Sequence, residues 1–201
     1  MRILLLFVLA SVAGCASVVA PRVQTEASAL REGEYTLDKT HAALTFKIDH
    51  LGFSSYVGRF EDFDATLTFD ADDPTTSQLD AVIEVASLDI ANDDFAETLI
   101  GPDWFDASAF PQARFVSRTV TVTGETEGTV EGDLTLKGIA RPVTLDVRFN
   151  GGARDLLRGN QYVVGFSAKG TFDRTAFGVD KFAGPVGTDV TIEIEAEFLR
   201  D

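Results

Sequence analysis

Residues 35–70 read YTLDKTHAALTFKIDHLGFSSYVGRFEDFDATLTFD, and this stretch decides the fold. Apolar and polar residues alternate over 42–50 and again over 63–70, a period of two that is typical of strands with one buried face. The residues that share the apolar face are Ala42, Leu44, Phe46, Ile48 and His50 in the first part, and Phe63, Ala65, Leu67 and Phe69 in the second. The stretch therefore predicts two half-buried strands joined as a hairpin, with a face rich in phenylalanine.

The same alternation recurs along the rest of the chain. Six further segments show it, at about 79–86, 113–122, 130–136, 143–149, 164–172 and 190–198, and residues 72–74, 137–142 and 150–152 have the composition of turns. Strands with one apolar and one polar face favour an antiparallel sandwich or closed barrel over a parallel sheet. An eight-stranded barrel has an interior that side chains can fill or that can hold one small ligand. The sequence thus predicts an all-β domain of eight antiparallel strands.

One segment, NDDFAETLIGPDWFDASAF at residues 92–110, breaks this alternation. Asn92 is suited to cap a helix, Asp93 and Asp94 are favourable in its first turn, and Gly101 followed by proline ends it. We expect a short helical insert around residues 92–108 that closes one end of the barrel.

The composition restricts the partners. The chain has 201 residues, which suits one domain, and 16 Phe but one Trp, so its interior needs few buried hydrogen bonds. The formal net charge of −15 excludes a basic surface for nucleic acid, and it disfavours attraction of the folded part to an anionic bilayer.

The N-terminus has the features of a targeting segment. A basic start precedes an apolar run at 3–13 that is too short to span a bilayer. The run ends in Val12-Ala13-Gly14-Cys15, which resembles a bacterial lipobox, so residues 1–14 are predicted as a lipoprotein signal peptide and Cys15 as the lipidated residue. An ordinary signal peptide that is cut nearby and discards Cys15 is the alternative.

This targeting segment implies an exported protein and divides the chain. Ala16 and Ser17 follow the cysteine, and no Asp is present to favour inner-membrane retention, so we expect a periplasmic protein anchored to the outer membrane. Residues 15–33 are predicted as a flexible tether and residues 34–200 as the barrel domain.

Ionisable side chains show no pattern of a metal or nucleophile site. His41 and His50 differ in parity and would face opposite ways on one strand, and no CxxC, HxH, HExxH or GxSxG spacing is present. The sequence therefore predicts no metal, cofactor or catalytic residue. His50 ends the apolar face, where it is either a satisfied rim histidine or a polar contact for a ligand head group.

Arg174 is the second polar candidate. It continues the parity of the apolar face over 164–172, and a guanidinium there needs an anion or several acceptors. Two interpretations remain open: an internal pair with Asp38 or with an Asp of 92–106, and a contact with a ligand head group at a cavity mouth.

The inward phenylalanines also allow two interpretations, a packed core and a ligand-filled lumen. Small residues share their faces, among them Ala42, Ala65, Gly132, Ala168 and Gly170. Mixed large and small residues either interdigitate or leave a lumen, and the alternation pattern alone does not decide between the two.

An ordered set of motifs over residues 34–199 resembles the YceI-like family of bacterial lipocalin-like proteins. The motifs are Tyr35-x-x-Asp38-x-x-His41, Gly58-x-Phe60, Phe105-Asp106, Phe110-Pro111, Gly132-x-Leu134-x-Leu136-x-Gly138, Arg174-x-x-Phe177-Gly178 and Val186-Gly187-x-x-Val190. One departure is Ala42, where the family usually has a serine, which weakens any role for a hydroxyl there.

The resemblance implies an eight-stranded antiparallel lipocalin-like barrel with an elongated apolar pore that binds isoprenoid chains or other long amphiphiles. It also implies an exported, non-enzymatic protein. On this basis the residues expected to line the pore are Phe46, Ile48, Phe63, Leu67, Phe69, Phe115, Leu134, Phe166 and Phe172, with His50 and Arg174 near its mouth.

The leading hypothesis is a lipoprotein that transports, stores or sequesters a polyisoprenoid such as a polyprenyl phosphate or an isoprenoid quinone. Its expected partners are this ligand and, through the lipid anchor, a membrane; a homodimer is compatible with it. The alternatives are a small enzyme that acts on a hydrophobic substrate through His50 or Asp94, and a structural envelope protein with a filled core.

Overall fold

The computed structural model describes residues 20–26 and 29–201, and within them strands predominate. The predicted signal peptide at 1–14 and the predicted lipidation at Cys15 lie outside these residues. The described strands are β1 (Gly33–His50), β2 (Ser54–Phe60), β3 (Phe63–Phe69), β4 (Gln78–Glu84), β5 (Leu88–Ile90), β6 (Gln112–Val122), β7 (Glu127–Leu136), β8 (Ile139–Asp155), β9 (Gln161–Asp173) and β10 (Val186–Arg200). One α-helix, α2 (Asp93–Ile100), and short 3₁₀ turns at Pro74–Thr76, Val85–Ser87 and Arg174–Phe177 complete the described fold.

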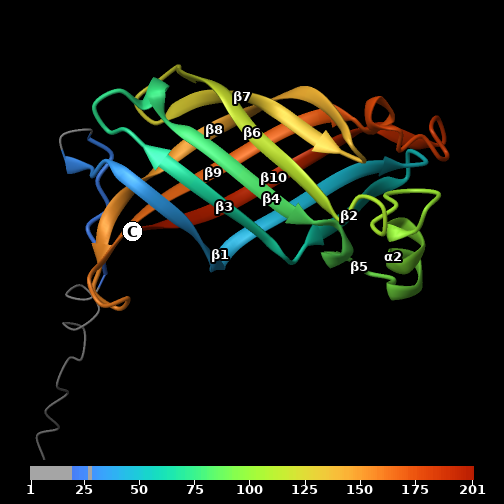
Figure 1. The fold of residues 1–201 in the computed structure, drawn as a ribbon, viewed down its shortest axis with the longest axis horizontal. Helices are drawn as coiled ribbons and strands as arrows, with labels where there is room; N and C mark the ends of the chain where they lie inside the picture. The colour runs from blue at the N-terminus through green and yellow to red at the C-terminus, as the bar shows by residue number, and fades with distance from the viewer. Residues whose placement is uncertain (1–19, 27–28) are drawn as a thin grey trace, which may run out of the picture.

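Eight of the strands close into an antiparallel barrel (Figure 1). The order of neighbours is β10-β9-β8-β7-β6-β4-β3-β1, and the pairing of β1 with β10 closes the ring. β2 and β5 extend the sheet from the second half of β1 at the end of the barrel where α2 lies. The predicted eight-stranded antiparallel barrel is therefore confirmed.

β1 is longer than its alternation pattern indicates and has two successive partners on one edge. Its first residues pair with β3 (Gly33 with Phe69), and its second half pairs with β2 (Leu44 with Phe60). The predicted hairpin between 42–50 and 63–69 is therefore wrong, because β2 lies between them in sequence and takes that place. The tight turn before β2 is made possible by left-handed backbone at Leu51 (φ 61°) and Gly52 (φ 72°).

β8 runs through the segment that was predicted as a turn at 150–152. The ladder between β8 and β9 shifts register between Phe149 and Gly151, which is a β-bulge and not a chain reversal. Gly151 has φ 116°, and a Cβ atom there would overlap the Val23 side chain, so the bulge requires glycine. The chain reverses instead at 156–160.

The described part of the predicted tether lies against the barrel. Gln24 pairs with Gly152 through two backbone hydrogen bonds of 2.9 and 2.8 Å. The Tyr35 hydroxyl donates to the Arg31 carbonyl at 2.6 Å, and Arg200 Nε donates to the Glu32 carbonyl at 2.9 Å. Residues 24–26 and 29–33 are thus held at the end of the barrel opposite α2.

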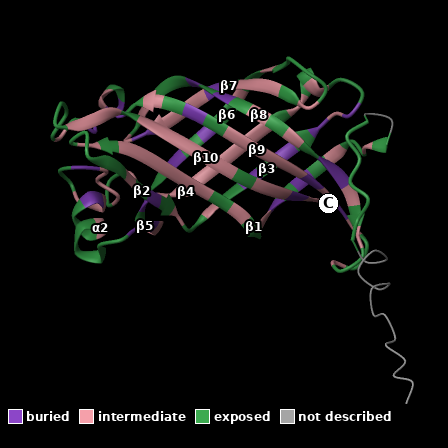
Figure 2. Cartoon of the chain, turned by 180° about the vertical axis from the view of Figure 1, so that it is seen from behind, coloured by how far each residue is buried: buried purple, intermediate pink, exposed green. Residues whose placement is uncertain are grey.

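Buried residues form two clusters, one toward each end of the barrel. Figure 2 shows buried and exposed positions in alternation along the strands, as the period of two requires. At the end with the chain termini, Phe69 of β3 stacks on Phe149 of β8 with ring centroids 5.9 Å apart. β3 and β8 are not neighbours in the sheet, so this contact crosses the lumen.

The short helical insert is confirmed. Asn92 caps α2 by accepting a hydrogen bond at Oδ1 from the Phe95 amide at 3.0 Å, and Gly101 follows the last helical residue. Leu99 is the residue that α2 buries. Among the described helices, none has the length and apolar character needed to cross a bilayer.

An Asn92→Ala variant is expected to lower the free energy of unfolding by about 1 kcal/mol, because the Phe95 amide loses its side-chain acceptor and keeps only the bond of 3.1 Å to the carbonyl of residue 92. Urea unfolding followed by circular dichroism measures this change. Asn92→Ser retains a side-chain acceptor and serves as the control, which should stay close to the unchanged chain. Equal losses in both variants would contradict a capping role.

Candidate functional site

The barrel encloses a cavity of about 910 Å³, within the range of typical ligand sites. All eight barrel strands line it; one contact from each is Phe46 (β1), Phe69 (β3), Leu79 (β4), Phe115 (β6), Leu134 (β7), Val147 (β8), Phe166 (β9) and Ile192 (β10). Its wall is thus built from the inward apolar faces that the alternation predicted.

The cavity is long. β1 lines it from Leu37 to His50, a stretch of about 43 Å along the strand at about 3.3 Å per residue. With the strand tilt of about 35–45° that barrels require, this corresponds to roughly 30–35 Å along the barrel axis. Such a shape fits an extended chain better than a compact molecule.

Every residue predicted from the sequence to line the pore lies at this cavity: Phe46, Ile48, His50, Phe63, Leu67, Phe69, Phe115, Leu134, Phe166, Phe172 and Arg174. Ala65, Ala81, Ala113, Ala168 and Ala196 line it as well. The small residues therefore leave a lumen between the large ones, which decides between the two interpretations of the phenylalanine faces. That these residues bind a ligand stays a prediction.

An aromatic cap covers the cavity at the α2 end. Tyr56, Phe95, Trp104 and Phe182 line the cavity and form a chain of ring contacts, with successive centroids 6.2, 6.3 and 6.1 Å apart. The sequence analysis missed all four. Phe95 and Leu99, spaced i, i+4 on the predicted insert, were the available signal for an inward helix face, whereas Phe182 lies in a loop without any pattern.

Arg174 is buried, with 4 % exposure, and backbone carbonyls satisfy its guanidinium. Nε donates to Gly187 (2.9 Å), Nη1 to Val179 (2.5 Å) and Lys181 (3.1 Å), and Nη2 to Val186 (3.3 Å). Burial holds the pKa of Arg174 below its ordinary value.

No carboxylate of the described residues lies within ion-pair distance of Arg174, so the expected internal pair with Asp38 or an Asp of 92–106 is wrong. The acceptors are carbonyls of the 179–187 loop and the start of β10, and Arg174 holds this loop against the cavity mouth.

His50 ends the inward face of β1 at the same mouth. Its ring lines the cavity 6.0 Å from the ring of Tyr56, measured between centroids. Of the two histidine rings in the described part of the chain, that of His41 has hydrogen-bond partners and that of His50 has none. A polar ligand atom at this mouth would therefore find a hydrogen-bonding partner in His50.

The opposite end of the cavity has a different character. Glu26, Glu125 and Glu127 line it there, together with hydroxyl groups such as Thr126. Carboxylates at this mouth disfavour an anionic ligand group. Among the described residues that line the cavity, Arg174 is the one Lys or Arg, and it has a single N–H left to donate.

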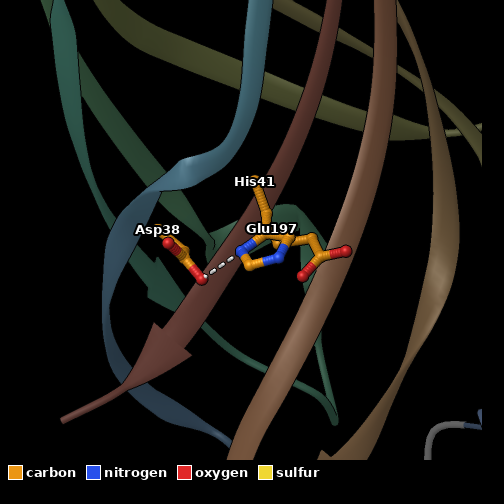
Figure 3. Close-up of side chains that lie close together, drawn as sticks. All are labelled: Asp38, His41 and Glu197. Carbon is orange, nitrogen blue, oxygen red and sulfur yellow. Dashed lines mark hydrogen bonds and ion pairs between the residues drawn. The ribbon is translucent and has the colours of Figure 1, made fainter. Parts of the chain in front are cut away.

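A second polar cluster lies on the barrel wall at the β1 bulge. Figure 3 shows Asp38, His41 and Glu197 side by side, close enough for their ligand atoms to share an ion. Arg158 already occupies the cation position, at 3.2 Å from Asp38 and 2.6 Å from Glu197. The arrangement is thus an ion-pair network that needs no metal.

Asp38 is the centre of this network. Burial acts to raise its pKa, but hydrogen bonds from Thr40 and His41 outweigh that effect and hold the pKa below its ordinary value. The carboxylate therefore remains charged at neutral pH and keeps Arg158 in place.

Comparison with known proteins agrees with this architecture. A UPF0312 protein of Pseudomonas savastanoi pv. phaseolicola is 36% identical over 167 residues, covering 82% of this chain and 84% of the relative. The crystal structure of Burkholderia cenocepacia BcnA superposes with a TM-score of 0.72 at 27% identity, over 80% of this chain and 98% of that one.

A more distant structure shares the fold. It is described as a polyisoprenoid binding domain from Saccharophagus degradans, and it matches with a TM-score of 0.61 at 14% identity over 85% of this chain and all of that one. The YceI-like domain itself matches residues 35–198, from the start of β1 to the end of β10. The chain therefore belongs to the YceI-like family.

Proposed function

We propose that this protein is a binding protein for a polyisoprenoid or a similar long-chain amphiphile, which it transports, stores or sequesters. The observation that carries this proposal is the long apolar cavity of about 910 Å³ that runs through the barrel. The polyisoprenoid binding described for the Saccharophagus degradans domain, which has the same fold, supports it.

The cavity supplies enough driving force for such a ligand. Burying several hundred Å² of hydrocarbon at about 25 cal/mol per Å² contributes on the order of 10 kcal/mol. Association and ordering cost several kcal/mol of this, which leaves useful affinity without any strong polar contact.

The polar groups at the two mouths favour an uncharged head group. Most N–H groups of Arg174 already donate to backbone carbonyls at one mouth. Glu26, Glu125 and Glu127 line the other mouth. A polyprenyl phosphate would find little compensation for losing its hydration. An isoprenoid quinone needs only hydrogen-bond donors, and His50 is placed to supply one.

The alternatives have less support. Asp94 is an exposed residue of α2 and does not line the cavity, so it does not form an acid–base pair with His50 there. A structural protein with a filled core is at odds with the volume of the lumen. We therefore propose a binding role without catalysis.

The test is organic extraction of the purified full chain followed by mass spectrometry. We expect a co-purified long-chain amphiphile. Titration should then show tighter binding of an isoprenoid quinone than of a polyprenyl phosphate with the same number of isoprene units. An empty protein that also fails to bind either compound would overturn the proposal.

We also propose that the protein is exported and anchored to a membrane through a lipid on Cys15. The resemblance of residues 12–15 to a lipobox supports this. In a bacterial host with a lipoprotein pathway, intact-mass measurement is expected to show loss of residues 1–14 and acyl groups on Cys15. A Cys15→Ser variant should lack the acyl mass. A soluble product cut elsewhere would show that the segment is an ordinary signal peptide.

A further inference from the structure

The loop between β8 and β9 presents apolar side chains to solvent at the barrel end opposite α2. Leu156 is 59% exposed and Leu157 is 78% exposed. Val23, which packs on Gly151 of β8, is 54% exposed at the same end. Leu156 and Leu157 are adjacent in sequence and form a small exposed apolar patch, and Val23 adds apolar surface at the same end, whereas single exposed apolar residues are ordinary.

The loop between β8 and β9 that carries Leu156 and Leu157, called the leucine loop below, is fixed in this position. Arg158 pairs with Asp38 (3.2 Å), Asp155 (3.3 Å) and Glu197 (2.6 Å), which ties the loop to β1 and β10. The Leu157 amide donates to Asp155 Oδ1 at 2.8 Å. The loop therefore holds both leucines outward without needing to rearrange, and this lowers the ordering cost of any contact they make.

Three arginines without carboxylate partners lie at the same end of the barrel. Arg22, Arg31 and Arg154 lie in no ion pair among the described residues, and the undescribed segments 1–19 and 27–28 contain no acidic residue. The Arg31 guanidinium lies 5.3 Å from the Tyr162 ring centroid, and Arg154 donates to the Asn160 carbonyl at 2.9 Å.

The first described segment, residues 20–26, lies at this same end of the barrel (Figure 1). From Cys15 to Gln24, the first residue paired with β8, the chain spans at most about 30 Å at about 3.4 Å per residue. A membrane that receives the N-terminal segment therefore lies within reach of the leucine loop.

We propose that this surface, formed by Val23, Leu156 and Leu157 with Arg22, Arg31 and Arg154, docks on a phospholipid bilayer. The leucines enter the boundary between head groups and acyl chains, and the arginines contact lipid phosphates. A second copy of the chain is a poor occupant, because the same unpaired arginines would face one another. Leu30 and Glu26 line the cavity at this end, so docking would bring one mouth of the cavity to the bilayer.

This inference does not depend on which lipid the cavity holds. Phosphatidylcholine and phosphatidylethanolamine present phosphates without net negative charge, so they should suffice for docking.

The first experiment is flotation of the full chain and of its Cys15→Ser form with phosphatidylethanolamine–phosphatidylcholine vesicles. We expect Leu156→Ser/Leu157→Ser to bind about tenfold more weakly, because two apolar side chains no longer leave water. The matched control, Phe53→Ser/Val57→Ser, removes exposed apolar side chains at the other end of the barrel and should bind like the unchanged chain.

Three outcomes would overturn the proposal: no flotation of the unchanged protein, an undiminished leucine variant, or an equal loss in the control, which would place the contact at the α2 end. Lipid extraction from each variant separates docking from cargo binding. We expect the leucine variant to retain the lipid bound in the cavity. Loss of that lipid would indicate a damaged barrel. In that case, flotation of the arginine variant Arg22→Gln/Arg154→Gln would decide whether this surface docks on the bilayer.

A second measurement reports which end of the barrel faces the vesicle. Trp104 is the single tryptophan and lies in the cap at the α2 end. On vesicles containing brominated phospholipid, Leu157→Trp should add emission that the bromines quench, while Trp104 emission of the unchanged chain stays unquenched. Quenching of Trp104 alone would contradict the proposed orientation.

Discussion

An Arg174→Ala variant is expected to be about 3–5 kcal/mol less stable than the unchanged protein. The guanidinium is 4 % exposed and donates to the carbonyls of Val179, Lys181, Val186 and Gly187. Alanine leaves these acceptors without donors and opens a void beside them, so the 179–187 loop should detach from the barrel mouth.

Urea unfolding gives the free energy, and hydrogen exchange of the 179–187 amides reports the loop. Arg174→Lys keeps the positive charge but not the planar fork, so we expect it to recover less than half of the loss. Arg59→Ala is the control, because Arg59 is an exposed arginine whose ion pairs lie at the surface, and little change is expected. Full stability of Arg174→Ala would show that water replaces the guanidinium without cost.

An Ala168→Phe variant is expected to lose its ligand while keeping its fold. Ala168 lines the cavity on β9, between Val147 and Ile194 of the neighbouring strands. A phenyl ring there would displace about four methylene groups of a bound chain at about 0.8 kcal/mol each, which is roughly a hundredfold in affinity.

The measurement combines lipid extraction with titration of an isoprenoid quinone. Ala43→Phe is the matched control, since Ala43 lies exposed on the outer face of β1 and its substitution leaves the lumen unchanged. If Ala168→Phe binds as tightly as Ala43→Phe, the cavity near β9 is not where the chain of the ligand lies.

Much of the barrel could be predicted because a period of two assigns each side chain to a face independently of its partner strand. Phe46, Ile48 and Phe166 were assigned inward by parity alone, and the structure places them on the cavity wall. The partners themselves were not predictable in this way: nothing in the alternation of β1 shows that its two halves pair with different strands.

The residues that line the cavity could be predicted from the sequence, but the volume of the cavity could not. Whether Phe69 and Ala168 interdigitate or leave a lumen depends on how strands from distant parts of the chain are staggered. A single sequence does not show this stagger, so it does not give the distance between facing side chains. The surroundings of Arg174 were missed for a related reason. Its acceptors are backbone carbonyls of a loop, and any residue type provides a carbonyl, so no side-chain pattern marks them.

The pairing of β1 with β10 also determines when folding can finish. Tyr35 pairs with Arg200, so the seam of the barrel joins the first and the last strand to form. A chain that leaves a ribosome from its N-terminus presents β1 with one open edge until β10 emerges. Such late, non-local closure makes folding slow and leaves β1 exposed to pairing with other chains. Synthesis of β10, rather than of any interior segment, is therefore the event after which the wall of the cavity can be complete.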